Sequence, residues 1–455
     1  MENINREHPE YVARKAIWKQ YKDLYAGGEQ LRTNASLYLV RRHKEPGEIY
    51  LERLARVFYQ NYIGSIIDWY AATLMRCEPG LLFEGSDPAA IDFYGVLSED
   101  CDLKGTSLSE FFRQRFVDVL VCGSSFIVVD FPKVDGTPRS RAEEDACGKS
   151  RAYLVDYSPE EVINWSQNRA GGLDWVVLRT SCLQQSKVTD AKREKETRWI
   201  YYDRENYQIY RRHGDSSPIE LIDEGRHGMA SVGRVPLFEI KVSDGLWLMN
   251  KSASLQLEHF NKSNALSWAL TMGLFASPVV YSDHEWKQVV GESYYIQLGK
   301  DDRFGWTEPE GKVYQIAADN LVSLRDEIYR VCYLMSQSGD TGSGRQSALS
   351  LQMEFATTEE VLRAYGDTVK EGLKQILWAI AAARQDGVSI DVSGMDEFDI
   401  NSLGTELDDA QKLLALGIES KTLKKEIFKR LAFKYLSDAS QDVKNRVAEE
   451  IEGAH

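Results

Sequence analysis

Residues 339–346 read Gly-Asp-Thr-Gly-Ser-Gly-Arg-Gln, and they are the stretch of this chain nearest to a phosphate-binding loop. Such a loop, G-x-x-x-x-G-K-[ST], surrounds phosphates with backbone N–H groups and adds a lysine and a magnesium-binding hydroxyl. Here Arg345 replaces the lysine and Gln346 replaces the hydroxyl. The segment also follows a predicted helix, where the nucleotide fold requires a strand. A nucleotide-binding enzyme using this loop therefore remains only an alternative, and a thermal shift with ATP and magnesium would test it.

No other residues have a spacing typical of catalysis or metal binding. The seven histidines include no H-x-x-x-H or H-E-x-x-H pattern, and the six cysteines include no C-x-x-C pair. Asp301, Asp302 and the carboxylates at 308–310 lie near glycine and proline. Turn residues are therefore the favoured interpretation, and metal ligands are the less favoured one. No Gly-x-Ser-x-Gly nucleophile elbow occurs. We therefore predict no catalytic residue, no cofactor and no metal, and we expect free thiols.

Basic residues cluster once in the chain. The cluster comprises Lys421, Lys424, Lys425, Lys429, Arg430 and Lys434, beside an apolar helical stripe. A solvated helix face is the favoured interpretation, and a DNA contact through Lys421, Lys424, Lys425 and Lys429 is the other.

Length and charge limit the class of protein. A chain of 455 residues is long enough for several domains, and its composition, 43% hydrophobic and 27% charged, is typical of a globular protein. It contains no run of eighteen apolar residues and no signal-peptide pattern at residues 1–7, so we expect a cytosolic origin and no membrane contact. The net charge of −15 argues against a protein that grips nucleic acid over its whole surface. An acidic wall around DNA would instead let the polyanion slide.

The first 245 residues predict an α+β domain. Helices are expected at 8–26 and 47–76, and a capping box at Ser107 to Glu110 opens a third that Gly123 ends. Short runs rich in β-branched and aromatic residues predict a mostly antiparallel sheet, with strands at 126–131, 152–157, 173–179, 199–203, 207–211 and 236–242. The charged stretches at 132–149 and 184–196 are predicted loops.

The following segment predicts a helix at 246–274 with an unusually polar first half. We expect a helix this polar to stand in solvent or to pack against copies of itself. A small β-α-β insert should follow, with a strand at 278–281, a helix at 282–290 and strands at 294–298 and 313–316. It would project between that polar helix and a second helix at 321–337.

Two helices on either side of an exposed, mobile loop at 340–347 organise the rest of the chain. The second runs from Leu351 to Arg384 with Gly387 as its C-cap, roughly 50 Å, and a capping box at Thr357 is a point where it would restart or bend. Three shorter helices are expected at 406–416, 421–436 and 441–451.

This order of parts resembles the wing, stem, clip, stem, tunnel loop, tunnel helix and crown of tailed-bacteriophage portal proteins. Local sequence is similar to one siphophage-type branch of that family at residues 55–62, 157–165, 176–179, 276–280 and 416–421. The similarity covers nearly the whole chain. It implies a wing at 1–245, stem helices at 246–274 and 319–337, a clip at 275–318, a tunnel loop at 338–350, a tunnel helix at 351–387 that returns to the wing, and a crown at 388–455.

The resemblance also implies a function. Portal proteins form rings, usually of twelve copies, at one capsid vertex, through which double-stranded DNA is packaged and later ejected. The major capsid protein would surround the wing, and the terminase and a head–tail adaptor would dock at the clip, first in the host cytoplasm and then in the virion. The residues facing DNA would be Ser343, Gly344, Arg345, Gln346 and Ser347. A different ring-forming head–tail connector or capsid component is the other alternative, and the subunit number stays open.

Overall fold

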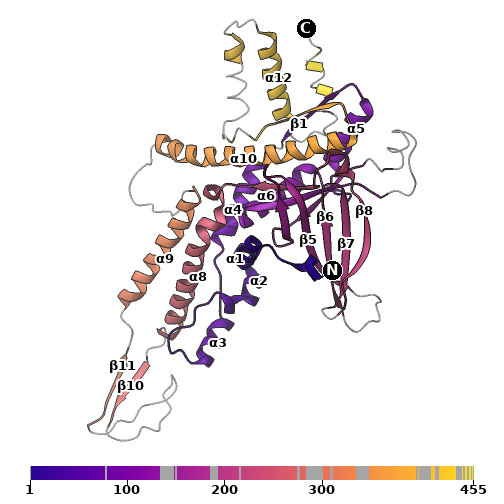
Figure 1. Cartoon of the computed structure of the whole chain (residues 1–455). Helices are drawn as coiled ribbons and strands as arrows, with labels where there is room; N and C mark the ends of the chain where they lie inside the picture. The colour runs from indigo at the N-terminus through magenta and orange to yellow at the C-terminus, as the bar shows by residue number, and fades with distance from the viewer. Residues whose placement is uncertain are drawn as a thin grey trace. The chain divides into compact units, whose positions relative to one another are not determined.

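The structure is a computed structural model that describes residues 2–76, 79–133, 148, 151–184, 193–214, 217–273, 277–282, 301–307, 311–334, 348–395, 398, 411–415, 420–436, 443, 446–447, 450–451 and 453. The chain is of mixed α and β class (Figure 1). It forms two compact units. Unit 1 contains residues 1–22, 65–250 and 343–455, and unit 2 contains residues 23–64 and 251–342.

Unit 1 contains a three-stranded antiparallel sheet in the order β3-β2-β9. Its strands are β2 (Ser124–Asp130), β3 (Tyr153–Tyr157) and β9 (Leu237–Lys241), as the sequence predicts. Helix α6 (Leu108–Cys122) precedes β2, and the Ser107 hydroxyl accepts a hydrogen bond from the Glu110 backbone N–H at 3.3 Å. Gly123, with φ of 86°, ends the helix because glycine adopts the left-handed region without strain. The predicted helix start, with Ser107 as its N-cap, and the glycine stop are confirmed.

A second antiparallel sheet of unit 1 has five strands in chain order. They are β4 (Val162–Gln167), β5 (Leu173–Gln184), β6 (Glu194–Tyr202), β7 (Asn206–His213) and β8 (Glu220–Arg226). The strands predicted near β5, β6 and β7 are confirmed, whereas β4 and β8 were not predicted. Strand β8 carries mostly polar, exposed side chains, so its strand conformation comes from pairing with β7 and not from burial. The apolar core of this region draws on both sheets, including Val128, Val176 and Leu237.

Helix α10 (Ala348–Arg384) is one continuous helix of 37 residues. The apolar residues that recur along it at three- and four-residue spacing are buried: Leu362, Tyr365, Val369, Leu373, Ile376 and Ile380 are at most 1% exposed. The predicted restart at Thr357 is wrong, because the helix continues through that residue. The predicted C-cap is also wrong, since Gln385, with φ of 60°, takes the left-handed conformation in place of Gly387.

A buried ion pair fixes this end of α10. Arg384 Nε lies 2.8 Å from Asp386 Oδ2, both side chains are at most 3% exposed, and the Tyr94 hydroxyl donates to the same carboxylate at 3.1 Å. Tyr94 belongs to α5 (Pro88–Glu99), which neighbours the two-stranded pair of β1 (Gly80–Gly85) and β12 (Val388–Ser393). Neither α5 nor this strand pair was predicted.

The described part of unit 1 also contains other elements. They are the 3-10 helices η1 (Glu2–Asn5), η3 (Gly228–Val232) and η4 (Asp244–Leu246), and helix α12 (Lys421–Tyr435), which confirms the predicted helix at 421–436. Of the predicted helix at 406–416 the structure describes only 411–415, which is helical. Most of the third, at 441–451, lies outside the described residues. No helix in the described part of the chain is long and apolar enough to cross a bilayer.

The N-terminal helices of the chain differ from the prediction. Helix α1 (Pro9–Ala26) is close to the predicted 8–26, but α2 (Gly28–Thr33) and the 3-10 helix η2 (Ala35–Leu37) follow directly. The single helix predicted at 47–76 is wrong. It is two helices, α3 (Gly47–Ala55) and α4 (Tyr62–Leu74), separated by residues 56–61.

The polar helix α8 (Leu248–Gly273) explains that interruption. Asn264 accepts a hydrogen bond from the Phe58 backbone N–H at 3.1 Å and donates to the Phe58 carbonyl at 2.9 Å. Gln256 likewise accepts a hydrogen bond from the Ile63 backbone N–H at 3.3 Å and donates one to the Gln60 carbonyl at 2.8 Å. These amides supply the backbone partners that a continuous helix would have supplied itself.

We expected the polar side chains of α8 to face solvent or other copies of the chain. That expectation is wrong for the polar side chains on the buried face of the helix. Ser252, Gln256, His259, Ser263 and Asn264 are all at most 8% exposed within a single chain. A side-chain amide is tolerated in a protein interior when both its donor and its acceptor are paired.

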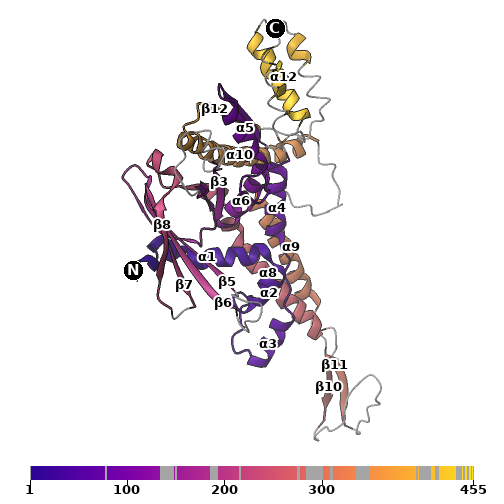
Figure 2. The same ribbon diagram turned by 90° about the vertical axis from the view of Figure 1, so that its right-hand side faces the viewer.

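The insert after α8 begins with the antiparallel hairpin of β10 (Ser277–Tyr281) and β11 (Arg303–Thr307). Strand β10 was predicted, whereas β11 was not, and the predicted helix at 282–290 and strand at 294–298 lie outside the described residues. The predicted strand at 313–316 is wrong, because those residues form the first turns of α9 (Gly311–Val331). The predicted second helix, at 321–337, thus starts about three turns earlier. Figures 1 and 2 show the hairpin beyond the ends of α8 and α9.

Candidate functional site

The loop residues Ser343, Gly344, Arg345, Gln346 and Ser347 lie outside the described residues, so the structure gives only the helices on either side of them. Helix α9 ends at Val331, and Tyr333 follows with φ of 59°. The Lys251 ammonium of α8 lies 4.3 Å from the centre of the Tyr333 ring and also donates to its hydroxyl. This contact fixes the point where the chain leaves the α8–α9 pair and enters the loop segment.

The exposed faces of α8 and α9 mix acidic and basic side chains. On α8, Lys262 forms an ion pair with Glu258 at 3.0 Å and donates to Asn320 of α9 at 2.9 Å. On α9, Arg330 pairs with Glu327 and Arg325 contacts Asp326. Since cations and carboxylates alternate here, these faces form no continuous basic track for a polyanion.

One buried histidine of α8 was not singled out from the sequence. His259 is 2% exposed, and its ring packs edge to face on Tyr62 with centroids 5.0 Å apart. Burial lowers its pKa, and the nearby Arg325 lowers it further. The neutral imidazole therefore acts as a packing group in unit 2. Among the described residues, no group of three or more His, Cys, Asp and Glu side chains is placed to hold a metal ion.

The candidate basic residues lie on α12. Lys421 and Lys424 are exposed, Lys425 is half-buried and Lys429 is 8% exposed. The helix begins with Ser420 as its N-cap, whose hydroxyl accepts from the Leu423 N–H at 3.2 Å. Two of the four lysines are therefore exposed to solvent, whereas Lys429 is buried and does not lie on a solvated face.

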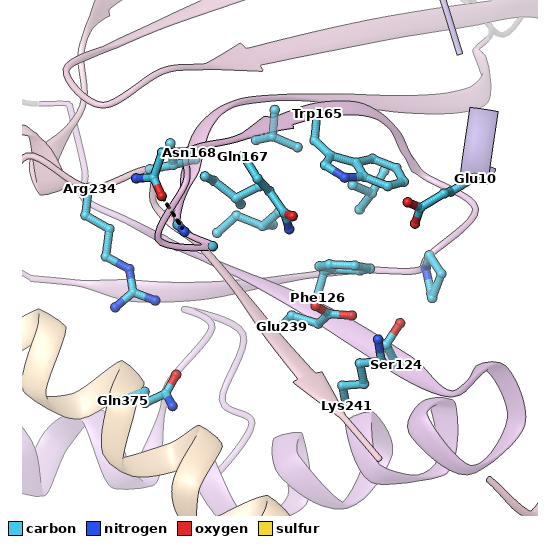
Figure 3. Close-up of a pocket in the computed structure, with 18 of the residues that line it drawn as sticks. Glu10, Ser124, Phe126, Trp165, Gln167, Asn168, Arg234, Glu239, Lys241 and Gln375 are labelled. Atoms are coloured by element: carbon cyan, nitrogen blue, oxygen red, sulfur yellow. Dashed lines mark hydrogen bonds between the residues drawn. The ribbon is translucent and has the colours of Figure 1, made fainter. Parts of the chain in front are cut away.

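A cavity of about 700 Å³ in unit 1 was missed by sequence reasoning (Figure 3). One face of the three-stranded sheet forms its floor, through the cross-strand pairs Phe126–Glu239 and Ser124–Lys241. The β4–β5 hairpin forms the opposite wall with Trp165. These elements are far apart in sequence, and the only local signals are the alternation along β9 and an i, i+4 pair on α1.

Charged groups surround this cavity unevenly. Glu10 and Arg14 enter it from α1, one helical turn apart, and Glu239 and Lys241 enter it from β9. Burial raises the pKa of Glu239, and Lys241, Ser124 and Arg14 partly oppose that rise. These two carboxylates and two cations compensate one another. Arg234 lies apart from them, with its guanidinium 4.1 Å from the centre of the Phe238 ring.

Comparison with known proteins adds no family. No family model matches this chain, and no curated protein matches it. It is similar to solved chains from gene transfer agent (GTA) particles. A chain of the neck of an empty GTA particle, computed with C6 symmetry, is 12% identical with a TM-score of 0.43, over 79% of this chain and 88% of that one.

Two further solved chains are similar at the same level. A chain from the virion of a native gene transfer agent particle is 13% identical with a TM-score of 0.39, over 86% of this chain and 95% of that one. A chain of the native neck, computed with C12 symmetry, has the same identity and TM-score, over 88% and 98% of the two chains. Likenesses with TM-scores below 0.5 establish no shared function.

Proposed function

We propose that this chain is a portal-type subunit, which assembles with its own copies into a ring-shaped DNA channel at one capsid vertex of a tailed phage or a phage-derived particle. The observation that carries the proposal is the order of elements in the described chain. An α+β region is followed by the long helix α8, the hairpin β10–β11, the long helix α9 and the 37-residue α10. This is the order on which the resemblance to portal proteins rests.

In this proposal the parts have separate partners. The wing, residues 1–245, contacts the major capsid protein, and the clip, residues 275–318, receives the packaging terminase and later a head–tail adaptor. The stem helices at 246–274 and 319–337 and the tunnel helix at 351–387 build the ring, and the crown is 388–455. The protein is made and assembled in the host cytoplasm, resides in the virion and has no enzymatic activity, because the motor ATPase is a separate protein.

The buried polar side chains of α8 change which residues contact neighbouring copies. Asn264 and Gln256 are occupied within the chain, so they do not line a channel. The exposed stripe of α8 instead contains Ser254, Glu258 and Lys262 at four-residue spacing. In the ring this stripe is the side of α8 available to a neighbouring subunit or to the bore.

Charge supports passage of DNA without tight binding. Each chain carries −15, so twelve copies would carry roughly −180. Within the loop, Arg345 and Gln346 are the groups best able to touch phosphate. Each subunit would present this loop to the bore, giving repeated weak contacts within an otherwise repulsive channel.

Negative-stain imaging of the purified full-length chain tests the ring. We expect particles with a central hole, and native mass spectrometry would give the number of copies. A monomer under all conditions would contradict the proposal. A ring that neither packages nor retains DNA would favour the other ring-forming head–tail connector or capsid component. A thermal shift with ATP and magnesium would favour the nucleotide-binding alternative at 339–346.

The loop assignment has its own test. We expect Arg345→Ala to change DNA packaging or retention while the ring still forms. Loss of the ring itself would contradict a role at the DNA surface. Charge reversal at Lys424 and Lys425 tests the crown in the same assay, and unchanged DNA retention would identify α12 as a solvated face.

A further inference from the structure

We propose that the cavity of unit 1 is a binding site for a small planar aromatic anion, in which Phe126 and Trp165 hold the ring and Arg234 holds the anionic group. The inference rests on unit 1 alone and does not use the ring assembly. The cavity volume, about 700 Å³, lies within the range of sites that enclose small organic ligands.

The aromatic part of the site is preorganised. His8 stacks on Trp165, with ring centroids 4.0 Å apart and an interplanar angle of 23°. This stack fixes the Trp165 ring, and the His8 backbone N–H donates to the Ile163 carbonyl of β4 at 2.8 Å, which fixes the histidine in turn. In Figure 3, Phe126 lies on the opposite side of the hollow from Trp165. A planar ring between them would contact aromatic groups on both sides.

The wall that carries Trp165 is also rigid. Asn168 Oδ1 accepts hydrogen bonds from the Ala170 N–H at 2.8 Å and the Gly172 N–H at 3.0 Å. Gly171 occupies the turn with φ of 85°, a conformation that glycine adopts without strain. The hairpin is therefore held in place before any ligand arrives, which lowers the entropic cost of binding.

The charges around the cavity favour an anionic group at the end where Arg234 lies. At one end, Glu10 and Glu239 lie with Arg14 and Lys241, so that end is neutral. At the other end, Arg234 is exposed and packs on the Phe238 ring, and no ion pair among the described residues includes it. Another arginine of the lining, Arg204, is already paired with Asp174 at 2.7 Å. Arg234 is thus the cation with capacity for a ligand carboxylate or phosphate.

Isothermal titration of the full-length chain with dTMP and with thymidine tests the site. We expect dTMP to bind with a Kd on the order of 10–100 μM, and thymidine to bind about tenfold more weakly. Arg234→Gln should remove this difference, so that the two ligands bind alike. Trp165→Ala should weaken both ligands by about tenfold, because stacking does not depend on the phosphate.

Matched variants and a second probe complete the design. Arg226→Gln on β8 and Trp175→Ala on β5 change the same residue types outside the cavity lining, and they should leave both affinities unchanged. N-acetylphenylalanine, an aromatic carboxylate, distinguishes the source of the anion. Its binding in place of dTMP, with the same dependence on Arg234, would assign the site to aromatic acids. No binding of any probe, or binding that Arg234→Gln and Trp165→Ala leave intact, would overturn the proposal.

Discussion

The amide side chain of Asn264 is the most direct test of how α8 shapes unit 2. Replacing Asn264 with leucine keeps a similar volume and removes both hydrogen bonds to the Phe58 backbone. A net loss of about 1 kcal/mol per hydrogen bond gives about 2 kcal/mol for the pair. The cost of leaving the Phe58 backbone groups unpaired lies in the lower part of the usual range, because Phe58 is 39% exposed and both hydrogen bonds are only partly buried.

Native-state hydrogen exchange is the suitable assay, because it measures local stability separately in each of the two compact units. A local loss of about 2 kcal/mol should accelerate exchange in residues 56–63 by about 30-fold. Protection of the β5–β6 pair in unit 1 should stay unchanged, which shows that the variant is folded.

Asn320→Leu is the matched control, since Asn320 is an exposed amide on α9. We expect it to change exchange in residues 56–63 less than threefold. Equal protection in Asn264→Leu and Asn320→Leu would refute the reasoning. The interruption between α3 and α4 would then depend on something other than the amides of α8.

Two further predictions concern unit 1. Asp386→Asn should lower the free energy of unfolding of unit 1 by about 3–5 kcal/mol, because the buried Arg384 guanidinium loses the negative charge of its carboxylate partner. Urea unfolding measures this loss. Glu371→Gln, at an exposed position of α10, is the control. For Glu7, burial raises the pKa, but hydrogen bonds from Lys15 and Arg179 outweigh it and lower the pKa below 4.5. A carboxylate with a lowered folded-state pKa stabilises the fold above the unfolded value and loses that contribution as the pH falls through the folded value. Glu7→Gln should therefore flatten the loss of stability below about pH 4.5, and an unchanged acid limb would contradict this.

The sequence alone determined the elements whose signals are local. The N-cap at Ser107, the glycine stop at Gly123 and the apolar stripe of α10 each depend on residues of a single helix, and the structure has all three. The β-branched and aromatic runs likewise predicted most of the strands. Such signals are readable because the interacting residues are close in sequence.

Tertiary structure alone decided the features that depend on distant partners. The pattern at 47–76 favours one helix, yet Asn264 and Gln256, about two hundred residues away, hold residues 56–61 in another conformation. The same contacts bury the amide side chains of Asn264 and Gln256, which the polar sequence pattern places in solvent. The cavity between Phe126 and Trp165 also exists only because two sheets and α1 meet. Hydrogen bonds and packing between remote segments outweigh local propensity at these places, since a buried backbone group must find a partner wherever the fold supplies one.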